Sequence, residues 1–469
     1  MSRINTNVTS LISQRVLGQN KNQLNVSLER LSTGLKINSG ADNPAGLIAS
    51  ENLRSEKAGI SQAINNAERA SNIVGTAEGG LSEISSLLTQ MQSLVGEAAN
   101  SGGLSKEEIN ANQLQVDSIL STINRIAGTT SFQGKKLLNG ELDYATSGVT
   151  ATQVNDLRIN AAKLGSAESV AVDVAVVASS EAATINYTGG TLASGAVQIE
   201  IAGNLGTEQL SLASGATASS IITAVNAVKD ITGVSATAAA GSGGGVVFSS
   251  TEFGASQFVS VKALSGTFTT DVTKDEGTDA QVTVNGNQAT TDGLNVSYRS
   301  GNLDVEFKLD ETFNAPGTSS FNIVGGGADF SMGSKVSNSD MASIGISAVT
   351  TGSLGTKSGG YLDSLKNGGE NALTGDNLVG AQKIVDTAVK QVAQLRGRLG
   401  AFQKFTIGST INNLGVALEN VSASESAIRD TDFAEETANL TRSQILSQAA
   451  QTVLAQANAA PQSALSLLQ

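Results

Sequence analysis

The sequence predicts a mainly α fold, with a long coiled-coil or helical-bundle core formed by both ends of the chain and an inserted β-rich α+β region between them. Two observations carry this prediction. Apolar residues recur with helical spacing over long stretches at both ends, whereas the middle has short alternating runs separated by glycines. The whole net charge of −13 also falls between residues 141 and 370, and both ends are close to neutral.

The N-terminal part predicts one long helix. Its apolar residues recur at steps of three and four, which is the spacing of a heptad a/d seam. Pro44 and the glycines at 102–103 bracket the seam, and the capping box at 105–108 opens a second helix that ends at Gly128. The seam consists of Ile60, Ala63, Ala67, Ala70, Val74, Ala77, Leu81, Ile84, Leu88, Met91, Val95 and Ala98.

The C-terminal part has a matching seam in two sections. The step of five residues between the sections predicts that the seam slips phase near residues 404–406, which would locally change the winding of a coiled coil. The first section is Val385, Ala388, Val392, Leu395, Leu399 and Phe402, and the second is Ile407, Ile411, Leu414, Leu418 and Val421.

The extreme termini carry two narrower apolar stripes. Neither stripe is wide enough to stabilise an isolated helix, so we expect these segments to pair with one another or to pack on neighbouring molecules. Periodicity alone also allows an ordinary bundle of core helices, but long Ala-rich seams without core aromatics favour a rod or an assembly. The stripes are Leu24, Leu28, Leu31 and Leu35, and then Leu446, Ala450, Val453, Ala457, Ala460 and Ala464, with Leu468 near the end.

The middle predicts strands with one helix, at Ala218–Val228. The acidic residues Asp271, Asp275, Glu276 and Asp279 lack EF-hand spacing and are expected to form a solvated loop rather than a calcium site. The glycine-rich run at 241–245 predicts a flexible turn. Strands are expected at Ala196–Ile201, Val246–Ser249, Val282–Val284 and Leu303–Leu309.

Composition excludes most catalytic chemistry. The chain has no Cys and no His, so disulfides, thiolate nucleophiles, Ser-His-Asp triads and His- or Cys-based metal sites are excluded. The acidic net charge disfavours a nucleic-acid partner. No N-terminal apolar stretch predicts a signal peptide, and no apolar run is long enough to cross a bilayer. We therefore expect no catalytic residue, metal, cofactor or membrane contact.

Both ends resemble bacterial flagellin. The resemblance rests on INTNVTSLISQRVL, LERLSTGLKINSGADNPAGLIASENLRSEKAGI and SFQGKKLLNG at the start, and on LGAFQKFTIGSTINNLGVALENV and LAQANAAPQSALSLLQ at the end. The segment Thr207–Ala238 resembles the small strand–helix–strand motif of some flagellin and hook-associated insertions.

The resemblance implies a subunit that polymerises into the flagellar filament for motility. It implies three parts: 1–42 with 432–469 as a terminal coiled-coil inner tube, 43–165 with 341–431 as a helical core with a β-hairpin near 132–138, and 166–340 as an exposed outer region. The implied partners are further copies of the chain, the cap and hook-junction proteins, the flagellar type III export apparatus, and an export chaperone on Leu440–Leu468. The implied location is the extracellular filament.

The stretch that corresponds to the one read by the vertebrate innate receptor for flagellin differs from many family members. Gln90 stands where many have Arg, and Leu94 remains, so we expect weak recognition. Two other functions compete with a filament subunit: a hook–filament junction or cap-associated protein, and an enzyme carried on the filament surface. The end of the chain favours the filament subunit.

Overall fold

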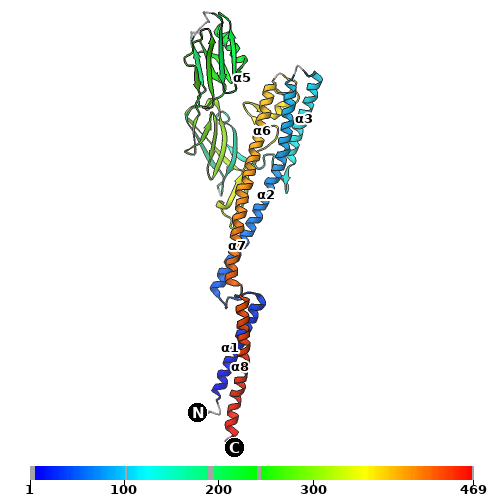
Figure 1. Ribbon diagram of the computed structural model, residues 1–469, viewed down its shortest axis with the longest axis vertical. Helices are drawn as coiled ribbons and strands as arrows, with labels where there is room; N and C mark the ends of the chain where they lie inside the picture. Colours follow the sequence, from blue (N-terminus) through cyan, green and yellow to red (C-terminus); the bar gives the residue numbers. More distant parts are fainter. Residues whose placement is uncertain are drawn as a thin grey trace. The chain divides into compact units, whose positions relative to one another are not determined.

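The computed structural model describes residues 6–100, 103–165, 167–188, 195–239, 245–375 and 377–466, with side chains described through residue 460. The chain forms two compact units (Figure 1). The first unit comprises Met1–Arg69, Ser331–Asp340 and Ile407–Gln469, and the second comprises Ala70–Phe330 and Met341–Thr406. Within the described residues, no helix combines the length and the apolar character needed to span a bilayer.

The first unit is built from helices that lie side by side in pairs. Asn7 caps α1 by accepting a hydrogen bond from the backbone N–H of Ser10 at 3.1 Å, and Gly34, at φ 73°, ends it in the left-handed conformation. Pro44 begins α2 at the position where a missing N–H costs nothing. The helices are α1 (Val8–Thr33) beside α8 (Phe433–Ser466), and the start of α2 (Pro44–Ala98) beside α7 (Gly408–Arg429).

The second unit contains the rest of α2, together with α3 (Lys106–Thr129) and α6 (Leu378–Ala401). The predicted capping box is confirmed: Ser105 accepts from the N–H of Glu108 and the Glu108 carboxylate accepts from the N–H of Ser105. The helix runs one residue beyond the predicted end at Gly128, because its last turn closes onto Thr130. The predicted hairpin is present as β1 (Ser131–Phe132) and β2 (Lys135–Lys136).

The predicted slip of phase is confirmed, and its cause is local. Residues Phe402–Ile407 form one π-helical turn between α6 and α7. A π-turn accommodates one extra residue through i→i+5 hydrogen bonds, so it absorbs the step of five between the two seam sections.

The part of the β-rich region nearest the helices holds two sheets around one core. That core includes Val172, Val174, Val305, Phe307 and Phe321. The five-stranded sheet has the order β14 (Asn287–Gln288), β13 (Gln281–Val284), β5 (Val170–Ala178), β18 (Gly317–Gly326) and β3 (Tyr144–Ser147). The four-stranded sheet has the order β15 (Thr290–Asp292), β16 (Asn295–Arg299), β17 (Leu303–Leu309) and β4 (Val154–Ala162).

A second β-core is built around Ile199, Ile201, Ile221 and Phe248. It joins the predicted helix, α4 (Ala218–Ala227), and the short α5 (Lys229–Thr232) to two sheets. One sheet has the order β6 (Thr184–Tyr187), β10 (Val246–Ser250) and β9 (Val234–Ala238). The other has the order β12 (Lys274–Glu276), β11 (Phe258–Ser265), β7 (Val197–Gly203) and β8 (Thr207–Leu212).

All four predicted strands and the predicted helix are present in these two cores. β3 and β4 pair with β18 and β17, so the sheets of the β-rich region begin at β3, close to the start of the acidic stretch at residue 141. The glycine-rich turn lies outside the described residues except for Gly245. The chain returns to the helices through β19 (Ala328–Ser331), β20 (Met341–Ile344), β21 (Gly355–Thr356), β22 (Gly360–Tyr361) and the 3₁₀ turn η3 (Leu362–Leu365).

Candidate assembly surface

The contact between α1 and α8 is made by small and polar side chains. Its buried residues follow a spacing of three and four, and side chains this small let two helices approach closely. The Ser10 hydroxyl donates to Asn458 Oδ1 at 2.7 Å, and the Asn7 amide donates to the carbonyl of Ala457 at 2.7 Å. The buried residues are Ser10, Ser13 and Ser27 on α1, and Glu436, Ser443, Ser447 and Ala450 on α8.

One ion pair lies in this contact. Arg30 Nη1 is 3.5 Å from Glu436 Oε2, and the Glu436 side chain is only 7% exposed. A carboxylate that is nearly removed from water needs such a partner, since an unpaired charge there is costly. The pair therefore matches α1 to α8 near their ends at Gly34 and Phe433.

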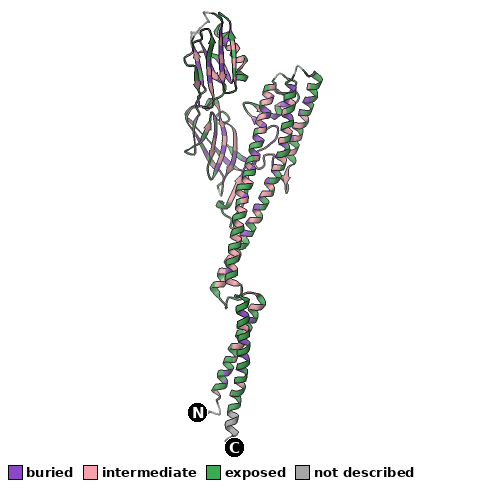
Figure 2. Cartoon of the chain, viewed as in Figure 1, coloured by how far each residue is buried: buried purple, intermediate pink, exposed green. Residues whose placement is uncertain are grey.

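Many of the larger apolar side chains of both helices are exposed to solvent, and Figure 2 shows most of α1 and α8 as exposed. Val8, Leu11, Ile12 and Val16 share one face of α1 by their i, i+3, i+4, i+8 spacing. A contiguous apolar stripe, unlike a single exposed leucine, indicates an interaction surface. The exposed apolar residues are Val8, Leu11, Ile12, Val16, Val26 and Leu28 on α1, and Phe433, Ile445, Leu446 and Val453 on α8.

The predicted terminal seam thus divides between two environments. Leu24, Leu31 and Leu35 are half-buried, whereas Leu28, Leu446 and Val453 are exposed. Leu468 lies outside the described residues. Apolar periodicity does not reveal the contact between α1 and α8, because the buried positions of that contact are mostly serines. The signal that could have found it is the serine spacing itself, at steps of three on α1 and four on α8.

The predicted core seam on α2 is buried from Ile60 to Ala98. In the second unit α2 runs antiparallel to α6, since Gln92 donates to Asp386 at 2.8 Å and Arg396 donates to Glu78 at 2.9 Å. The buried seam residues are Ile60, Ala63, Ala67, Val74, Leu81, Ile84, Leu88, Met91, Val95, Val385, Val392, Leu395 and Leu399. Those that are half-buried are Phe402, Ile411, Leu414 and Leu418. On α2, Gln90 is exposed and Leu94 is half-buried.

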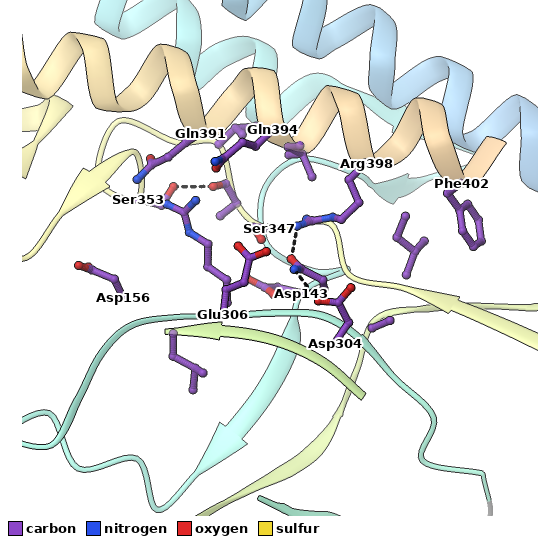
Figure 3. A pocket seen from close by; sticks show the side chains of 18 of the residues that line it. Asp143, Asp156, Asp304, Glu306, Ser347, Ser353, Gln391, Gln394, Arg398 and Phe402 are labelled. Carbon is purple, nitrogen blue, oxygen red and sulfur yellow. Dashed lines mark hydrogen bonds between the residues drawn. The ribbon is translucent and has the colours of Figure 1, made fainter. Parts of the chain in front are cut away.

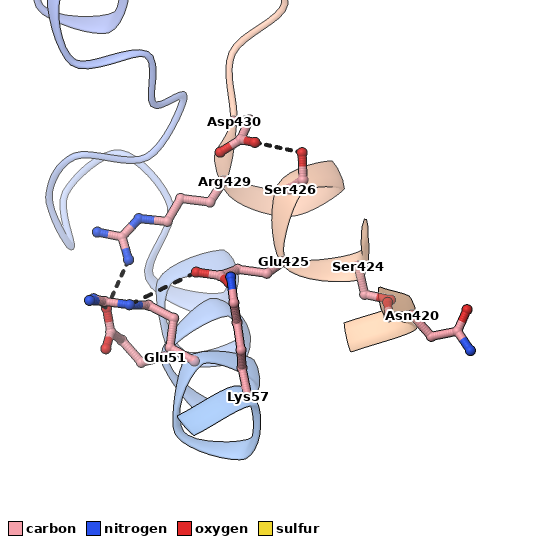
Figure 4. A network of polar contacts seen from close by, with 9 residues as sticks. Glu51, Lys57, Asn420, Ser424, Glu425, Ser426, Arg429 and Asp430 are labelled. Carbon is pink, nitrogen blue, oxygen red and sulfur yellow. Dashed lines mark hydrogen bonds and ion pairs between the residues drawn. The ribbon is translucent and has the colours of Figure 1, made fainter. Parts of the chain in front are cut away.

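A network of charged residues joins α2 to α7 within the first unit (Figure 4). Glu51 accepts hydrogen bonds from Arg54 and Arg429, both at 3.0 Å, and Lys57 donates to Glu425 at 3.2 Å. The hydrogen bond from Arg54 and the nearby positive charges of Arg54 and Arg429 lower the pKa of Glu51, although partial burial opposes them. The network is solvent-exposed on the Glu51 side, and exposed ion pairs contribute little to stability. Its main effect is therefore to align α2 with α7 along their lengths.

The acidic residues singled out in the middle have structural partners. Asp271 accepts from the N–H of Asn186 at 2.8 Å, and Asp275 accepts from the N–H of Thr184 at 2.7 Å. The described residues contain no group of three or more carboxylates arranged to hold a metal ion. These carboxylates therefore serve as acceptors for backbone donors at the edge of β6.

Three parts of the chain match known protein families. Residues 4–143 match the bacterial flagellin N-terminal helical region, and residues 382–468 match the bacterial flagellin C-terminal helical region. Residues 198–252 match the flagellin hook IN motif, which confirms the predicted strand–helix–strand insertion.

The chain is also similar to curated relatives along its whole length. It is 33% identical over 475 residues to flagellin D of Vibrio anguillarum, covering 99% of each chain. It is 31% identical over 469 residues to polar flagellin B/D of Vibrio parahaemolyticus, again covering 99% of each. Among solved structures, FliC of Burkholderia pseudomallei matches 71% of this chain and 99% of its own, at 15% identity and a TM-score of 0.24, which is too low to establish a common overall fold.

Proposed function

Since this chain belongs to the bacterial flagellin family, we propose that it polymerises head to tail, and that α1 and α8 complete their packing only against neighbouring copies. Membership of the family establishes the role itself: the chain is a structural subunit of the bacterial flagellar filament and not an enzyme. The proposal concerns how the subunit assembles.

The observation that carries the proposal is the outward apolar face of the terminal helices. Val8, Leu11 and Ile12 are each about half exposed or more, at 56%, 58% and 48%, whereas the smaller Ser10 and Ser13 of the same helix are buried. Transferring such side chains out of water stabilises by about 1.5–3 kcal/mol for each one that is fully buried. In a filament, a neighbouring subunit is available to cover this apolar face on each copy of the chain.

The contact must be heterologous. A self-complementary contact closes on itself as a dimer, whereas a contact between two different surfaces of the same chain repeats indefinitely as a helix. In this arrangement the terminal helices form a coiled-coil inner tube, and the longer helices with the β1–β2 hairpin surround it.

The β-rich region projects outward, starting at β3 as its strand pairing favours, and it carries the chain's excess negative charge. The subunit leaves the cell through the flagellar type III export apparatus, with a chaperone on its C-terminal helix, and meets cap and hook-junction proteins at the ends of an extracellular filament. Relatives named as flagellins along the full length favour the filament itself over a junction or cap component.

A matched pair of substitutions on α1 tests the assembly surface. Ile12→Asp places a charge on the outward apolar stripe, and Gln14→Asp places the same charge at a solvent-exposed polar position two residues away. Sedimentation and electron microscopy should find no filaments of Ile12→Asp at concentrations where Gln14→Asp polymerises as the unaltered chain does. Equal polymerisation of both variants would show that the stripe is not an assembly contact.

A further inference from the structure

A cavity of about 850 Å³ lies inside the second unit, between α6 and the strands β4 and β17. In Figure 3, Gln391, Gln394 and Arg398 reach from α6 toward Glu306, Asp304 and Asp143 on the opposite side. The volume lies within the range of small-molecule sites. Its walls combine charged groups of both signs with amides and hydroxyls, and Leu395 and Phe402 supply an apolar wall.

The cavity contains a guanidinium group without a partner. Among the residues that the structure describes, none accepts a hydrogen bond from the Arg158 guanidinium or forms an ion pair with it. Burial lowers the pKa of Arg158, although the carboxylates of Asp156, Glu306 and Asp143 act in the opposite direction from a distance. Such a group normally meets a carboxylate or phosphate directly, in a planar bidentate contact.

Arg398, from α6, is the second incompletely satisfied guanidinium. It donates to the amide oxygen of Asn160 and, at 3.3 Å, to the carbonyl oxygen of Gly345, but its buried Nε has no acceptor among the described residues. Burial is also the main cause that lowers the pKa of Arg398. Both of its acceptors are neutral, so the positive charge is not compensated by direct contact.

The third arginine of the lining differs from these two. Arg299 Nε donates to Asp304 Oδ2 at 2.7 Å, and the Arg299 side chain is 70% exposed. This pair neutralises itself at the rim. Arg299 therefore serves as a control: its substitution removes a positive charge from the lining, but its guanidinium is already paired with Asp304.

The remaining carboxylates determine what kind of anion fits. The Glu306 carboxylate makes no hydrogen bond to any described residue, and the Asp143 carboxylate accepts only the N–H of Tyr144, at 2.9 Å. A bare anion such as acetate or phosphate would face these two negative groups. A ligand that combines a carboxylate with several hydroxyls could present its carboxylate to the guanidinium groups and donate its hydroxyls to Glu306 and Asp143.

We propose that this cavity binds a polyhydroxylated carboxylate of the uronic-acid class, with its carboxylate held by Arg158 and Arg398 and its hydroxyls bonded to Glu306 and Asp143. The apolar ring face lies against Leu395 and Phe402. Every residue that lines the cavity belongs to the second unit, and none belongs to α1 or α8.

The test is calorimetric titration of the full-length monomeric chain with glucuronate, and with glucose and acetate as separate probes. Glucuronate should bind saturably and at least about tenfold more tightly than either glucose or acetate, which is about 1.4 kcal/mol. If glucose binds as tightly as glucuronate, the carboxylate does not contribute to binding. If acetate binds as tightly as glucuronate, the hydroxyls do not contribute. Either result, or the absence of saturable glucuronate binding, overturns the proposal.

Matched variants locate the site. Arg158→Met should weaken glucuronate binding by about tenfold or more, whereas Arg299→Met, at the rim of the same cavity, should weaken it by less than about threefold. Arg158→Met removes a charge that burial disfavours, so it should fold, and circular dichroism checks this. Glu306→Gln is the second variant and should weaken glucuronate more than acetate. Unchanged affinity in folded Arg158→Met overturns the assignment.

Discussion

Buried amide side chains of two helices bind the backbone of the segment that precedes α6, at Gly355, Leu365 and Leu373. Gln113 of α3 donates to the carbonyl of Leu365 at 2.9 Å and accepts from the N–H of Leu373 at 2.7 Å. Gln391 of α6 does the same with the carbonyl and N–H of Gly355, at 2.7 and 2.9 Å. Each amide satisfies one backbone donor and one acceptor that would otherwise be buried unpaired. In the sequence these glutamines look like ordinary surface residues, so periodicity does not predict their role.

Asp143 provides a prediction with a definite pH dependence. Burial raises its pKa above the ordinary value of 3.8, although its bond to the N–H of Tyr144 and the charges of Arg398 and Arg158 oppose the shift. A raised folded-state pKa means that the folded state favours the protonated carboxyl. The ionised group therefore costs stability, and the cost is present at neutral pH and disappears in acid.

Asp143→Asn should therefore raise the midpoint of thermal unfolding at about pH 7 and leave it nearly unchanged at about pH 3, where the native carboxyl is itself protonated. Scanning calorimetry at the two pH values measures the difference. A midpoint that falls at about pH 7, or a gain that is the same at both values, would contradict the prediction.

At the scale of elements, the π-turn at Phe402–Ile407 comes from one extra residue. The seam section that ends at Phe402 and the section that begins at Ile407 are five residues apart, whereas a continuous seam needs four. One widened turn takes up the extra residue, and after it Ile407 is buried while Ile411, Leu414 and Leu418 are half-buried. The spacing predicted where the slip occurs, but it did not decide between a change in coiled-coil winding and a local π-turn.

Deletion of Lys404 tests this explanation. Lys404 is exposed, and its removal shortens the step to four, so α6 and α7 should become one regular helix in which each seam section keeps its present degree of burial. The thermal unfolding midpoint should stay level or rise, and helicity by circular dichroism should not fall.

Deletion of Gln394 is the matched control. Gln394 is also exposed, but it lies within the regular part of α6, where removing a residue rotates the following positions by about 100°. Leu395 and Leu399 would then leave the core, and the unfolding midpoint should fall clearly. Equal loss in the two deletions would mean that the π-turn is not a simple insertion.

The close contact of α1 with α8 depends on small side chains. Ser447 is buried in it, so Ser447→Leu should force the helices apart at a cost of about 1–3 kcal/mol, whereas Ser447→Ala should be tolerated. Filaments of Ser447→Leu should therefore depolymerise at lower temperature than those of Ser447→Ala, as followed by light scattering. Identical depolymerisation temperatures would show that the helices do not touch through this face in the filament.

At the scale of the whole molecule, the β-rich region enters and leaves the helical part at adjacent points. Tyr144 is paired with Gly326, and the N–H of Gly327 donates to the carbonyl of Asp143 at 3.2 Å. The two ends of the insertion are therefore already neighbours. A region attached in this way can be removed with a short linker and without stretching the remainder.

A chain that lacks residues 144–326, with Asp143 joined to Gly327 by a short glycine linker, should still form filaments. Both terminal helices and the α2 seam remain in it, and the removed part carries most of the negative charge. Electron microscopy measures the outcome, and circular dichroism confirms that the helices are folded. If the shortened chain folds but does not polymerise, the insertion takes part in assembly and the prediction is wrong.

The terminal helices should fold only on assembly. Their contact with each other buries mainly serine, which contributes little against an ordering cost of about 1–2 kcal/mol per residue. Backbone amides of α1 and α8 should therefore exchange rapidly in the free monomer and become protected in the filament, while α2 and α6 are protected in both. Hydrogen exchange with mass spectrometry makes the comparison. Strong protection of α1 and α8 in the monomer would refute coupled folding.

The sequence by itself determined the long helices, their seams, the capping box, the position of the phase slip and four strands of the middle, because each depends on local spacing or local capping chemistry. Its resemblance to flagellin also identified the family. Only the tertiary structure decided which faces of α1 and α8 meet, since serines at helical spacing carry no apolar signal. It alone placed β3 and β4 in the inserted sheets and brought Arg158 and Arg398 into one cavity, because these contacts join residues far apart in the chain, and local pattern does not encode such pairings.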